Sequence, residues 1–478
     1  MASSLKTNVI LNYINTITRI IFPIITFPYV SRILLPDGVG VLNFQTSIIN
    51  YIVLFTSLGI PLYAVKEVAK YRDDISLRNK ITLEIIILSF LLCLIGYIAV
   101  FLIGHYVPSI NSNIKLFYIL SLMIVFNALG VNWFYQAIED FKFITVRAVV
   151  IRILATISIF VFVSDKSDLL IYGAITVGLS VGNNIINFFH LRKYIASLSL
   201  HIKIKDIFKH LKPALKIFVL NLIISIYVQL NTIMLGFMDG DFSVGIYTAG
   251  NNIPHVILTL VTSMGVVLLP RCSNLVASGK HIEFQHVCNK AIRLVLMLAL
   301  PFMSGLILLA KPIINIFCGI SFMGAVPVLY WTSPVILFIG LTNVIGIQIL
   351  YPLGKEKIVI YSTLGGAIVN VLLNIMLIPN YSAIGAGIST FAAELAVLII
   401  QVYLGKKYIP VEILNKNNYR YIIATILMII SVIPIVLLIC NSWLQIIISI
   451  SVGALVYGLC LLFYRDDIIL SFIKYKIK

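Results

Sequence analysis

Charged side chains are scarce in this chain of 478 residues, of which they make up only 11%. A soluble domain carries about 25% charged residues, because a water-exposed surface needs them. Hydrophobic residues make up 60% of the chain, and its mean hydropathy is +1.05. The composition therefore excludes a soluble globular protein and predicts one that is embedded in lipid.

Motifs for nucleotide-driven or hydrolytic chemistry are missing as well. Gly279-Lys280 and Gly354-Lys355 lack the earlier glycine and the following Ser or Thr of a phosphate-binding loop. Neither an H-E-x-x-H zinc motif nor a G-x-S-x-G nucleophile turn occurs. We therefore expect no cofactor, no metal and no catalytic residues, so any pumping must draw on an ion gradient, the membrane potential or a lipid gradient.

The six cysteines form no C-x-x-C pair, and most fall in apolar runs or in loops expected to face the cytoplasm. Isolated cysteines of this kind behave as small hydrophobic residues. The sequence therefore predicts neither a disulfide framework nor a metal site at Cys93, Cys272, Cys288, Cys318, Cys440 and Cys460.

Apolar runs of about 20 residues, the length that crosses a bilayer as a helix, recur along the whole chain. They predict an all-α polytopic membrane protein of about fourteen transmembrane helices. The predicted spans are 9–31, 41–64, 81–104, 116–137, 144–163, 168–190, 214–237, 245–269, 291–316, 325–350, 358–378, 383–404, 420–440 and 443–464.

Basic residues outnumber acidic ones, with 35 Lys+Arg against 18 Asp+Glu and a net charge of +17. In a soluble protein this excess would suggest nucleic acid, but here most basic residues fall in loops on one side of the predicted spans. Because basic loops of membrane proteins face the cytoplasm and its anionic lipids, we predict cytoplasmic termini and no nucleic-acid partner. The basic loop residues on the other side are Arg32, Lys115, Lys166 and Lys311.

Two short segments near the start of the chain recur near its middle. Leu5-Lys6 returns 206 residues later as Leu211-Lys212, and Val39-Gly40-Val41 returns 205 residues later as Val244-Gly245-Ile246. Because six helices separate the copies, the two halves would have the same orientation in the membrane. We predict two six-helix lobes around a central cavity, whose rocking gives alternating access, and two additional C-terminal helices. The predicted boundaries are 1–200, 201–410 and 411–478.

The first predicted helix has one polar face. Asn12, Asn15 and Arg19 lie on it by their spacing, and Arg19 is about 13 Å into the span at 1.5 Å per residue. An arginine near the bilayer midplane costs at least ~2.5–3.5 kcal/mol, so water or protein must surround it. Its planar fork suits a diphosphate. Alternatively Arg19 is structural, and caps carbonyl groups near Pro23 or pairs with a carboxylate.

Other polar residues in or next to the predicted spans are further candidates for substrate binding. Arg152 could reach the cavity or extend to the interface. Arg271, at the cytoplasmic end of a span, could receive a phosphate or only set the topology. Asn251 and Asn252 could bind sugar hydroxyls or hold helices together.

Two titratable residues are candidates for ion coupling. Glu394 is a carboxylate deep in a predicted span, where it could carry a proton or pair with an arginine. His255 could change its charge near neutral pH, or could be an ordinary hydrogen-bonded histidine.

Three segments together carry a resemblance to a known family: NYINTITRIIFPIITFPYVSRILLPDGVGVLNFQTSIINY (Asn12 to Tyr51), WFYQAIEDFKFITVRAVVIRI (Trp133 to Ile153) and IPNYSAIGAGISTFAAEL (Ile378 to Leu395). They resemble the Wzx-type polysaccharide flippases, the polysaccharide transporter branch of the multidrug/oligosaccharidyl-lipid/polysaccharide exporter superfamily. Arg19 matches the first-helix arginines of related lipid II flippases.

The resemblance implies translocation of undecaprenyl-diphosphate-linked oligosaccharide repeat units by alternating access, from the cytoplasmic to the periplasmic leaflet of the bacterial inner membrane. The product would serve synthesis of a surface polysaccharide such as O-antigen or capsule. The expected partners are the lipid-linked oligosaccharide, membrane lipids, a polysaccharide polymerase and chain-length machinery.

The alternative function is that of a cation-coupled exporter of small amphiphiles on the same fold. The first predicted helix, however, lacks the carboxylate that is frequent in the multidrug branch. A glycan polymerase or ligase is disfavoured, because such enzymes need large outer loops and the predicted outer loops are short. We therefore expect a transporter rather than an enzyme.

Overall fold

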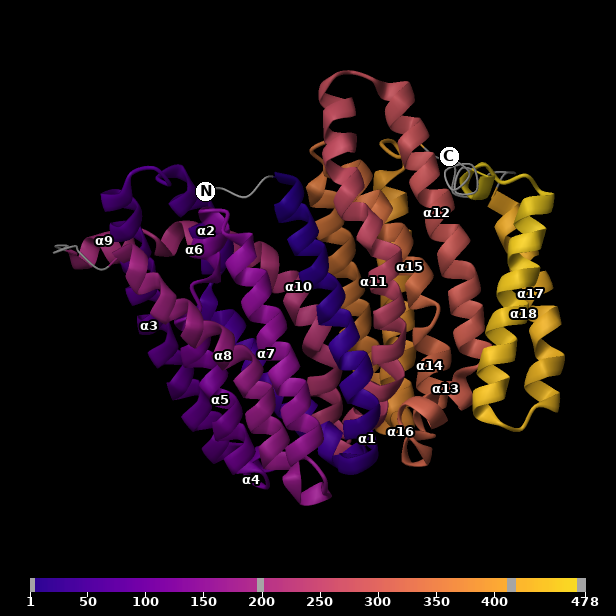
Figure 1. Ribbon diagram of the computed structural model, residues 1–478, viewed down its shortest axis with the longest axis horizontal. Helices are drawn as coiled ribbons and strands as arrows, with labels where there is room; N and C mark the ends of the chain where they lie inside the picture. The colour runs from indigo at the N-terminus through magenta and orange to yellow at the C-terminus, as the bar shows by residue number, and fades with distance from the viewer. Residues whose placement is uncertain (1–4, 196–201, 411–417, 471–478) are drawn as a thin grey trace. The chain divides into compact units, whose positions relative to one another are not determined.

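The computed structural model describes residues 5–195, 202–410 and 418–470, and within these ranges every regular element is a helix. Figure 1 shows the course of the chain. Packing divides it into two compact units, unit 1 (Met1–Gly245) and unit 2 (Ile246–Lys478). The predicted lobes of six, six and two helices stay a prediction.

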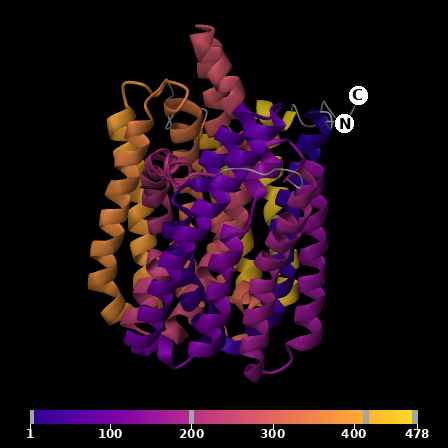
Figure 2. The same cartoon turned by 90° about the vertical axis from the view of Figure 1, so that its left-hand side faces the viewer.

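The helices of unit 1 run side by side in Figure 2. A 3-10 turn, Lys166–Asp168, precedes α8. The bounds are α1 (Leu5–Ser57), α2 (Ile60–Lys70), α3 (Ile75–Tyr106), α4 (Pro108–Asn111), α5 (Ile114–Ala128), α6 (Asn132–Ala137), α7 (Phe141–Phe162), α8 (Leu169–Ile195), α9 (Ile204–Phe208), α10 (Leu211–Met238) and the start of α11 (Asp241–Ala277).

Unit 2 continues from α11. It includes a 3-10 turn (Ile320–Phe322) and a π-helix (Val344–Leu350), the second of which extends α15. The α-helices are α12 (His281–Leu308), α13 (Ala310–Phe317), α14 (Ala325–Thr332), α15 (Val335–Asn343), α16 (Glu356–Gly405), α17 (Tyr419–Leu438) and α18 (Ser442–Phe463).

Ten helical segments of the described chain are long and apolar enough to cross a membrane, which confirms an all-α multi-pass membrane protein. The count of fourteen stays a prediction. Two of the ten, Ile17–Lys70 and Glu356–Gly405, have 54 and 50 residues, more than twice what one crossing needs. Each contains a non-helical residue, Leu35 in α1 and Ser382 in α16.

These two residues replace the longer loops that the sequence predicts at 32–40 and 379–382. Leu35 has φ 58° and ψ 178°, and it precedes Pro36. The proline ring pushes the preceding residue away from helical ψ toward an extended value, so the chain breaks there and helix resumes at once. Positive φ is costly for a residue other than glycine, so the break is held by the packing around it.

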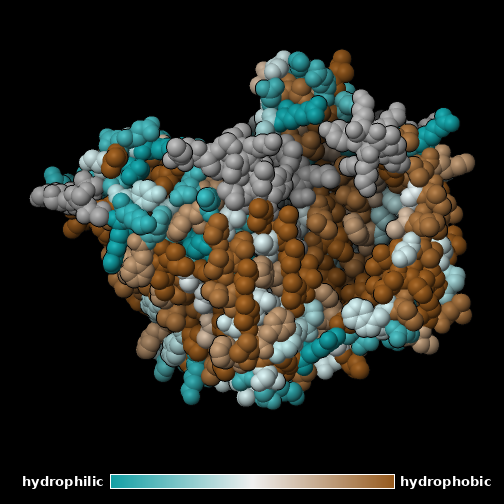
Figure 3. Space-filling model, in the orientation of Figure 1, coloured by the Kyte–Doolittle hydropathy of each residue, from teal (hydrophilic) through white to brown (hydrophobic). Residues whose placement is uncertain are grey.

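Large apolar side chains remain exposed along the middle of the helices. On α3, Leu94, Ile98 and Phe101 are 60%, 61% and 63% exposed. In Figure 3 the helical faces are hydrophobic between hydrophilic ends. An apolar surface of this extent is unfavourable in water and suited to hydrocarbon, so these faces lie against lipid.

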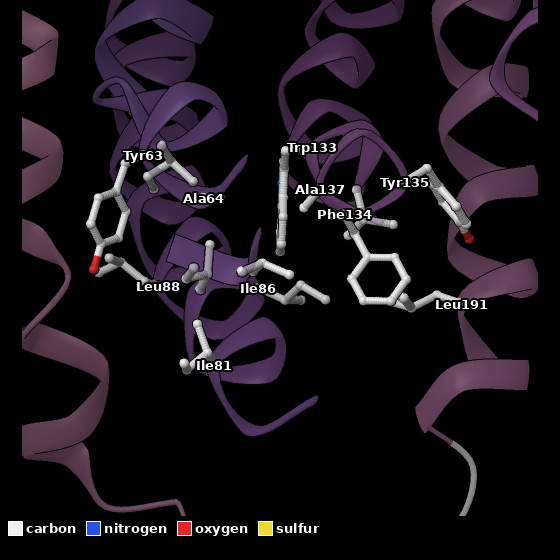
Figure 4. Close-up of a cluster of buried hydrophobic side chains, with 14 of the residues drawn as sticks. Tyr63, Ala64, Ile81, Ile86, Leu88, Trp133, Phe134, Tyr135, Ala137 and Leu191 are labelled. Carbon is white, nitrogen blue, oxygen red and sulfur yellow. The ribbon is translucent and has the colours of Figure 1, made fainter. Parts of the chain in front are cut away.

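The core at one end of unit 1 joins α2, α3, α6 and α8. Figure 4 shows Trp133 of α6 standing between Tyr63 and Ala64 of α2 on one side and Phe134 on the other. Trp133 is 5% exposed, and Phe134 and Tyr135 are fully buried. Three consecutive aromatic side chains of α6, Trp133 to Tyr135, enter this largely aliphatic core, so the short helix is fixed against its neighbours.

The two glycines of the sequence repeat meet each other in unit 1. A Cβ atom on Gly40 would clash with the carbonyl oxygen of Asp241, and one on Gly245 would clash with the carbonyl oxygen of Pro36. Pro36 and Asp241 are themselves 205 residues apart. The contact is therefore reciprocal, which is the pattern that a two-fold relation between the two segments produces.

Adding a methyl group at either glycine is expected to destabilise the protein. In Gly40→Ala or Gly245→Ala the new Cβ meets backbone atoms, which cannot swing aside, so a cost of about 1–3 kcal/mol is expected. The measurement is the melting temperature in detergent. Gly178→Ala on α8 is the control, because its Cβ meets nothing within 4 Å and alanine favours a helix. A fall for Gly178→Ala as large as that for Gly40→Ala would contradict the packing described.

Candidate functional site

Arg152 of α7 reaches the polar face of α1. Its Nη1 donates to Oδ1 of Asn15 at 2.9 Å, to Oγ1 of Thr18 at 2.7 Å and to the carbonyl oxygen of Asn15 at 3.3 Å. Oγ1 of Thr18 in turn donates to the carbonyl oxygen of Asn15 at 2.9 Å. The two helices pack along each other in unit 1. Arg152 is thus held by α1 rather than directed to the membrane interface.

Arg19 lies beside this contact. It is exposed on α1, and its positive charge repels that of Arg152. No described carboxylate lies within salt-bridge distance of either arginine, and the described chain offers the Arg19 guanidinium no hydrogen bond. Two uncompensated cations side by side at membrane depth attract an anion.

The other predicted residue on α1 is Asn12. Its backbone belongs to α1, and its side chain lies outside the described part of the structure. The amide of Asn15, which was expected to contact substrate, is used to hold Arg152. The roles of Asn12 and Asn15 in substrate binding stay predictions.

The remaining predicted residues lie in unit 2. Asn251 is half-buried on α11, whereas Asn252, His255 and Arg271 on the same helix are exposed. Glu394 is 7% exposed on α16. The described residues contain no group of three or more His, Cys, Asp or Glu side chains that could hold a metal ion. Substrate binding by these residues of α11 and ion coupling through His255 and Glu394 stay predictions.

Sequence reasoning missed a buried arginine on α7. Arg147 lies near the predicted cytoplasmic end of its span, where a basic residue usually only sets the topology, yet it is 7% exposed. Its Nε donates to Oδ1 of Asn183 at 3.0 Å, and its Nη2 donates to Oδ1 of Asn132 at 2.9 Å. The signal that could have found it is its place inside the predicted span 144–163, five residues before Arg152.

A second missed feature is a buried carboxylate in the first third of α3. Glu84 is fully buried, and its Oε2 lies 2.8 Å from Nζ of Lys209 and 2.9 Å from Nε2 of His210. Nδ1 of His210 lies 2.6 Å from the hydroxyl of Tyr63. A neutral imidazole fits both contacts, with Nε2–H donating to Glu84 and Nδ1 accepting from Tyr63. This chain of contacts ties the segment before α10 to α2 and α3.

The His210 cluster is expected to make stability depend on pH. Burial lowers the pKa of His210 below its usual 6.5, and Lys209 adds to this, while the bond to Glu84 opposes it. Below pH ~6.5 the imidazole of His210 therefore binds a proton in the unfolded chain but not in the folded chain. Stability is fully present above that pH and is lost as the pH falls toward the lowered pKa.

The measurement is the melting temperature in detergent at several pH values from about 8 down to about 5. His210→Gln keeps an amide that can donate to Glu84 but cannot be charged, so its pH dependence below about 6.5 should be shallower than that of the wild type. Equal slopes for the two proteins would show that His210 is not the titrating group.

Comparisons with known proteins place this geometry in a family. The family described as "Polysaccharide biosynthesis protein" matches residues 5–276, more than half of the chain, and the family MatE matches residues 217–376. A protein named "Putative O-antigen transporter" from Escherichia coli (strain K12) is 26% identical over 398 residues, which cover 82% of this chain and 94% of that protein. The lipid II flippase MurJ of Bacillus subtilis (strain 168) is 28% identical over 155 residues, which cover 32% of this chain and 28% of that protein.

Solved structures show the same fold. The lipid II flippase MurJ in an inward closed conformation matches with a TM-score of 0.72 and 20% identity, covering 96% of this chain and all of that chain. An inward-facing multidrug resistance transporter of the MATE family matches with a TM-score of 0.65 and 13% identity, covering 84% of this chain and 98% of that chain. The family model covers more than half of the chain, and the chain therefore belongs to the polysaccharide biosynthesis protein family.

Proposed function

We propose that this protein is a flippase that moves undecaprenyl-diphosphate-linked oligosaccharide repeat units from the cytoplasmic to the outer leaflet of the bacterial inner membrane. The observation that carries the proposal is the pair of cations Arg19 and Arg152, with no described carboxylate to neutralise them. The names of the relatives support it, since they are an O-antigen transporter and a lipid II flippase. The protein is a transporter, not an enzyme.

The two arginines have complementary roles in holding a diphosphate. Asn15 and Thr18 fix Nη1 of Arg152, which leaves its Nε and Nη2 without a partner in the described chain. No described residue occupies the fork of Arg19. A fixed and a free guanidinium offer the paired N–H groups that bind phosphate oxygens bidentately. The fixed one is already ordered, so binding loses less side-chain entropy.

The membrane potential favours the proposed direction. With an inside-negative potential, outward movement of each negative charge gains about 2.3 kcal/mol per 100 mV. The lipid tail would stay in the bilayer while the diphosphate and sugars pass through a wet path by alternating access. In this scheme both termini are cytoplasmic, and a polysaccharide polymerase with its chain-length machinery takes the product.

The test is reconstitution of the purified full-length chain in liposomes. Labelled undecaprenyl-diphosphate-linked oligosaccharide is added, and its appearance in the opposite leaflet is followed with a membrane-impermeant sugar-oxidising reagent. The proposal expects protein-dependent movement of this lipid and none of a cationic amphiphile. Movement of the cationic amphiphile alone would favour the cation-coupled exporter instead and would rule out the flippase.

A further inference from the structure

A polar cavity lies inside unit 1, apart from the two arginines. Its volume is about 290 Å³, and its wall comes from the end of α1, the start of α2, α3, the α5–α6 junction and α8. Amide, hydroxyl and indole groups line it, and no Asp, Glu, Lys or Arg is among its lining residues. The side chains used below are Asn127, Asn132, Trp133, Gln136 and Asn184.

The cavity lies where a predicted membrane span is broken. The sequence predicts one helix over 116–137, but α5 ends at Ala128 and α6 begins at Asn132. A Cβ on Gly130, between them, would lie only 2.6 Å from Oδ1 of Asn184, so the glycine lets this amide lie against the break. Non-helical backbone in a membrane is tolerated where it is buried in protein or lines a water-accessible cavity.

Asn132 is oriented by groups behind it. Its Oδ1 accepts from Nη2 of Arg147 at 2.9 Å and from Nδ2 of Asn187 at 3.1 Å. The carbonyl side of the amide is therefore occupied. The NH₂ group of Asn132 has no partner among the described residues, and it remains as a donor at the cavity wall.

Asn184 is the strongest sign of a ligand. It is 7% exposed, lines the cavity and makes no hydrogen bond within the described chain. Its amide atoms are not fully enclosed by protein, so they face the open space of the cavity, where a bound molecule can hydrogen-bond to them. With one donor free on Asn132 and a whole amide free on Asn184, the wall offers both donors and acceptors at fixed positions.

The wall chemistry selects a neutral, hydroxyl-rich ligand. Amides donate to and accept from hydroxyl groups, and the indole of Trp133 gives an apolar surface at the edge of the cavity. Without charged lining residues, an ion has no counter-charge there. The volume equals that of about ten waters at ~30 Å³ each, close to the number of non-hydrogen atoms in one substituted sugar ring.

We propose that this cavity is a binding site for a single neutral sugar residue, held by Asn132 and Asn184 beside Trp133. Resting on the proposed function, the ligand is one sugar of the transported lipid-linked oligosaccharide. Arg147, which orients Asn132, and Arg152, which is held on α1, are five residues apart on α7, or about 7.5 Å along its axis. Helix α7 thus connects the arginine pair with the cavity. The arginines hold the diphosphate, and the cavity distinguishes substrates by their sugar.

The first test measures binding of the glycan alone. Trp331→Phe and Trp443→Phe leave Trp133 as the single tryptophan reporter of the full chain. The probe is the neutral glycan released by mild acid from lipid-linked oligosaccharide, extracted from cells that lack this transporter. A saturable change in Trp133 emission is expected, and in the same background Asn184→Leu should need at least ~10-fold more glycan, about the effect of one lost hydrogen bond to a ligand.

The matched control is Thr176→Val on the same helix. Its hydroxyl bonds its own helix at the carbonyl oxygen of Tyr172, 2.9 Å away, so its removal should leave glycan binding unchanged. Asn184→Leu replaces an unpartnered buried amide with an apolar group of similar size, so its melting temperature should not fall. Two results would mean that the cavity holds water only. One is no saturable response in the single-tryptophan protein that keeps Asn184, and the other is half-saturation at the same glycan concentration with and without Asn184→Leu.

The transport assay separates failure of this site from failure of the flippase. If wild type moves the lipid-linked oligosaccharide and Asn184→Leu moves it equally well, the sugar site is wrong and the flippase stands. If wild type moves no such lipid but Trp133 of the single-tryptophan protein still responds to the glycan, the flippase is wrong and the sugar site stands. Undecaprenyl diphosphate without sugars should bind Asn184→Leu and wild type equally, because it does not enter the cavity.

Discussion

Reversing the charge at Arg19 is expected to abolish transport without unfolding the protein. In Arg19→Glu the new carboxylate lies beside Arg152, whose charge it would neutralise, so the local net charge falls from two positive charges to none. A bound diphosphate then meets repulsion from Glu and loses the fork of Arg152. We expect loss of surface polysaccharide in cells and at least a ~100-fold fall in the liposome assay, corresponding to about 2.7 kcal/mol.

Two further variants define the cause. Arg19→Lys keeps the charge but loses bidentate geometry, and it should retain partial transport. Arg192→Glu, on an exposed residue of α8, makes the same charge change outside the site and should transport like wild type. Melting temperatures of all three should match that of wild type, because Arg19 makes no described contact that folding requires. Normal polymer in cells that carry Arg19→Glu would remove the diphosphate role.

The largest loss of stability is expected at Asp466 in unit 2. This carboxylate is fully buried, and its Oδ2 accepts from the hydroxyl of Tyr421 at 2.7 Å and from Nη2 of Arg293 at 3.3 Å. The same Oδ2 forms a salt bridge with Nη2 of Arg420 at 2.9 Å. Its Oδ1 accepts from the backbone N–H of Ile468 at 2.8 Å. Asp466→Asn leaves the mostly buried guanidinium of Arg420 without its counter-charge and leaves Arg293 with only the exposed Asp467, at a cost of about 3–5 kcal/mol.

The neighbouring residue provides the control. Asp467 is 81% exposed and lies 3.4 Å from Arg293, so Asp467→Asn should cost only about 0–1 kcal/mol. The measurement is the melting temperature of both variants in detergent. Because Arg293 lies on α12 and Tyr421 on α17, Asp466→Asn should also expose the α12–α17 contact to proteolysis. Equal melting temperatures for Asp466→Asn and Asp467→Asn would contradict the buried cluster.

Apolar patterning made the fold class predictable, because a chain in lipid must satisfy its backbone hydrogen bonds within each helix. It also placed Arg19 on a polar face, since helical spacing is a local property. The partner of Arg152 was not predictable, because Asn15 is 137 residues away and no periodicity links the two. Arg147 and Glu84 were hidden for another reason: a charge near the end of a span has the same pattern whether it is buried or solvated.

Two further features depend on backbone details that a hydropathy pattern averages out. The break between α5 and α6 follows from three residues around Gly130, and glycine is common in intact membrane helices. The break in α1 at Leu35 is a single residue before Pro36, so it depends on one proline and not on a polar loop. Sequence reasoning therefore found the helices and the first cation, but not the cavity that the broken helix lines.

The contact between Gly40 and the start of α11 has a consequence for synthesis of the chain. The same half of α1 also contacts α10. The hydroxyl of Ser47 donates to Gln229 at 2.9 Å, and Phe44 packs against Gly236. At about 5–20 residues per second, the second partner leaves the ribosome some 10–40 seconds after the first. During that interval the first helices are in the membrane with this side uncovered, so an insertase or chaperone has a defined surface to shield until residue 245 has been made.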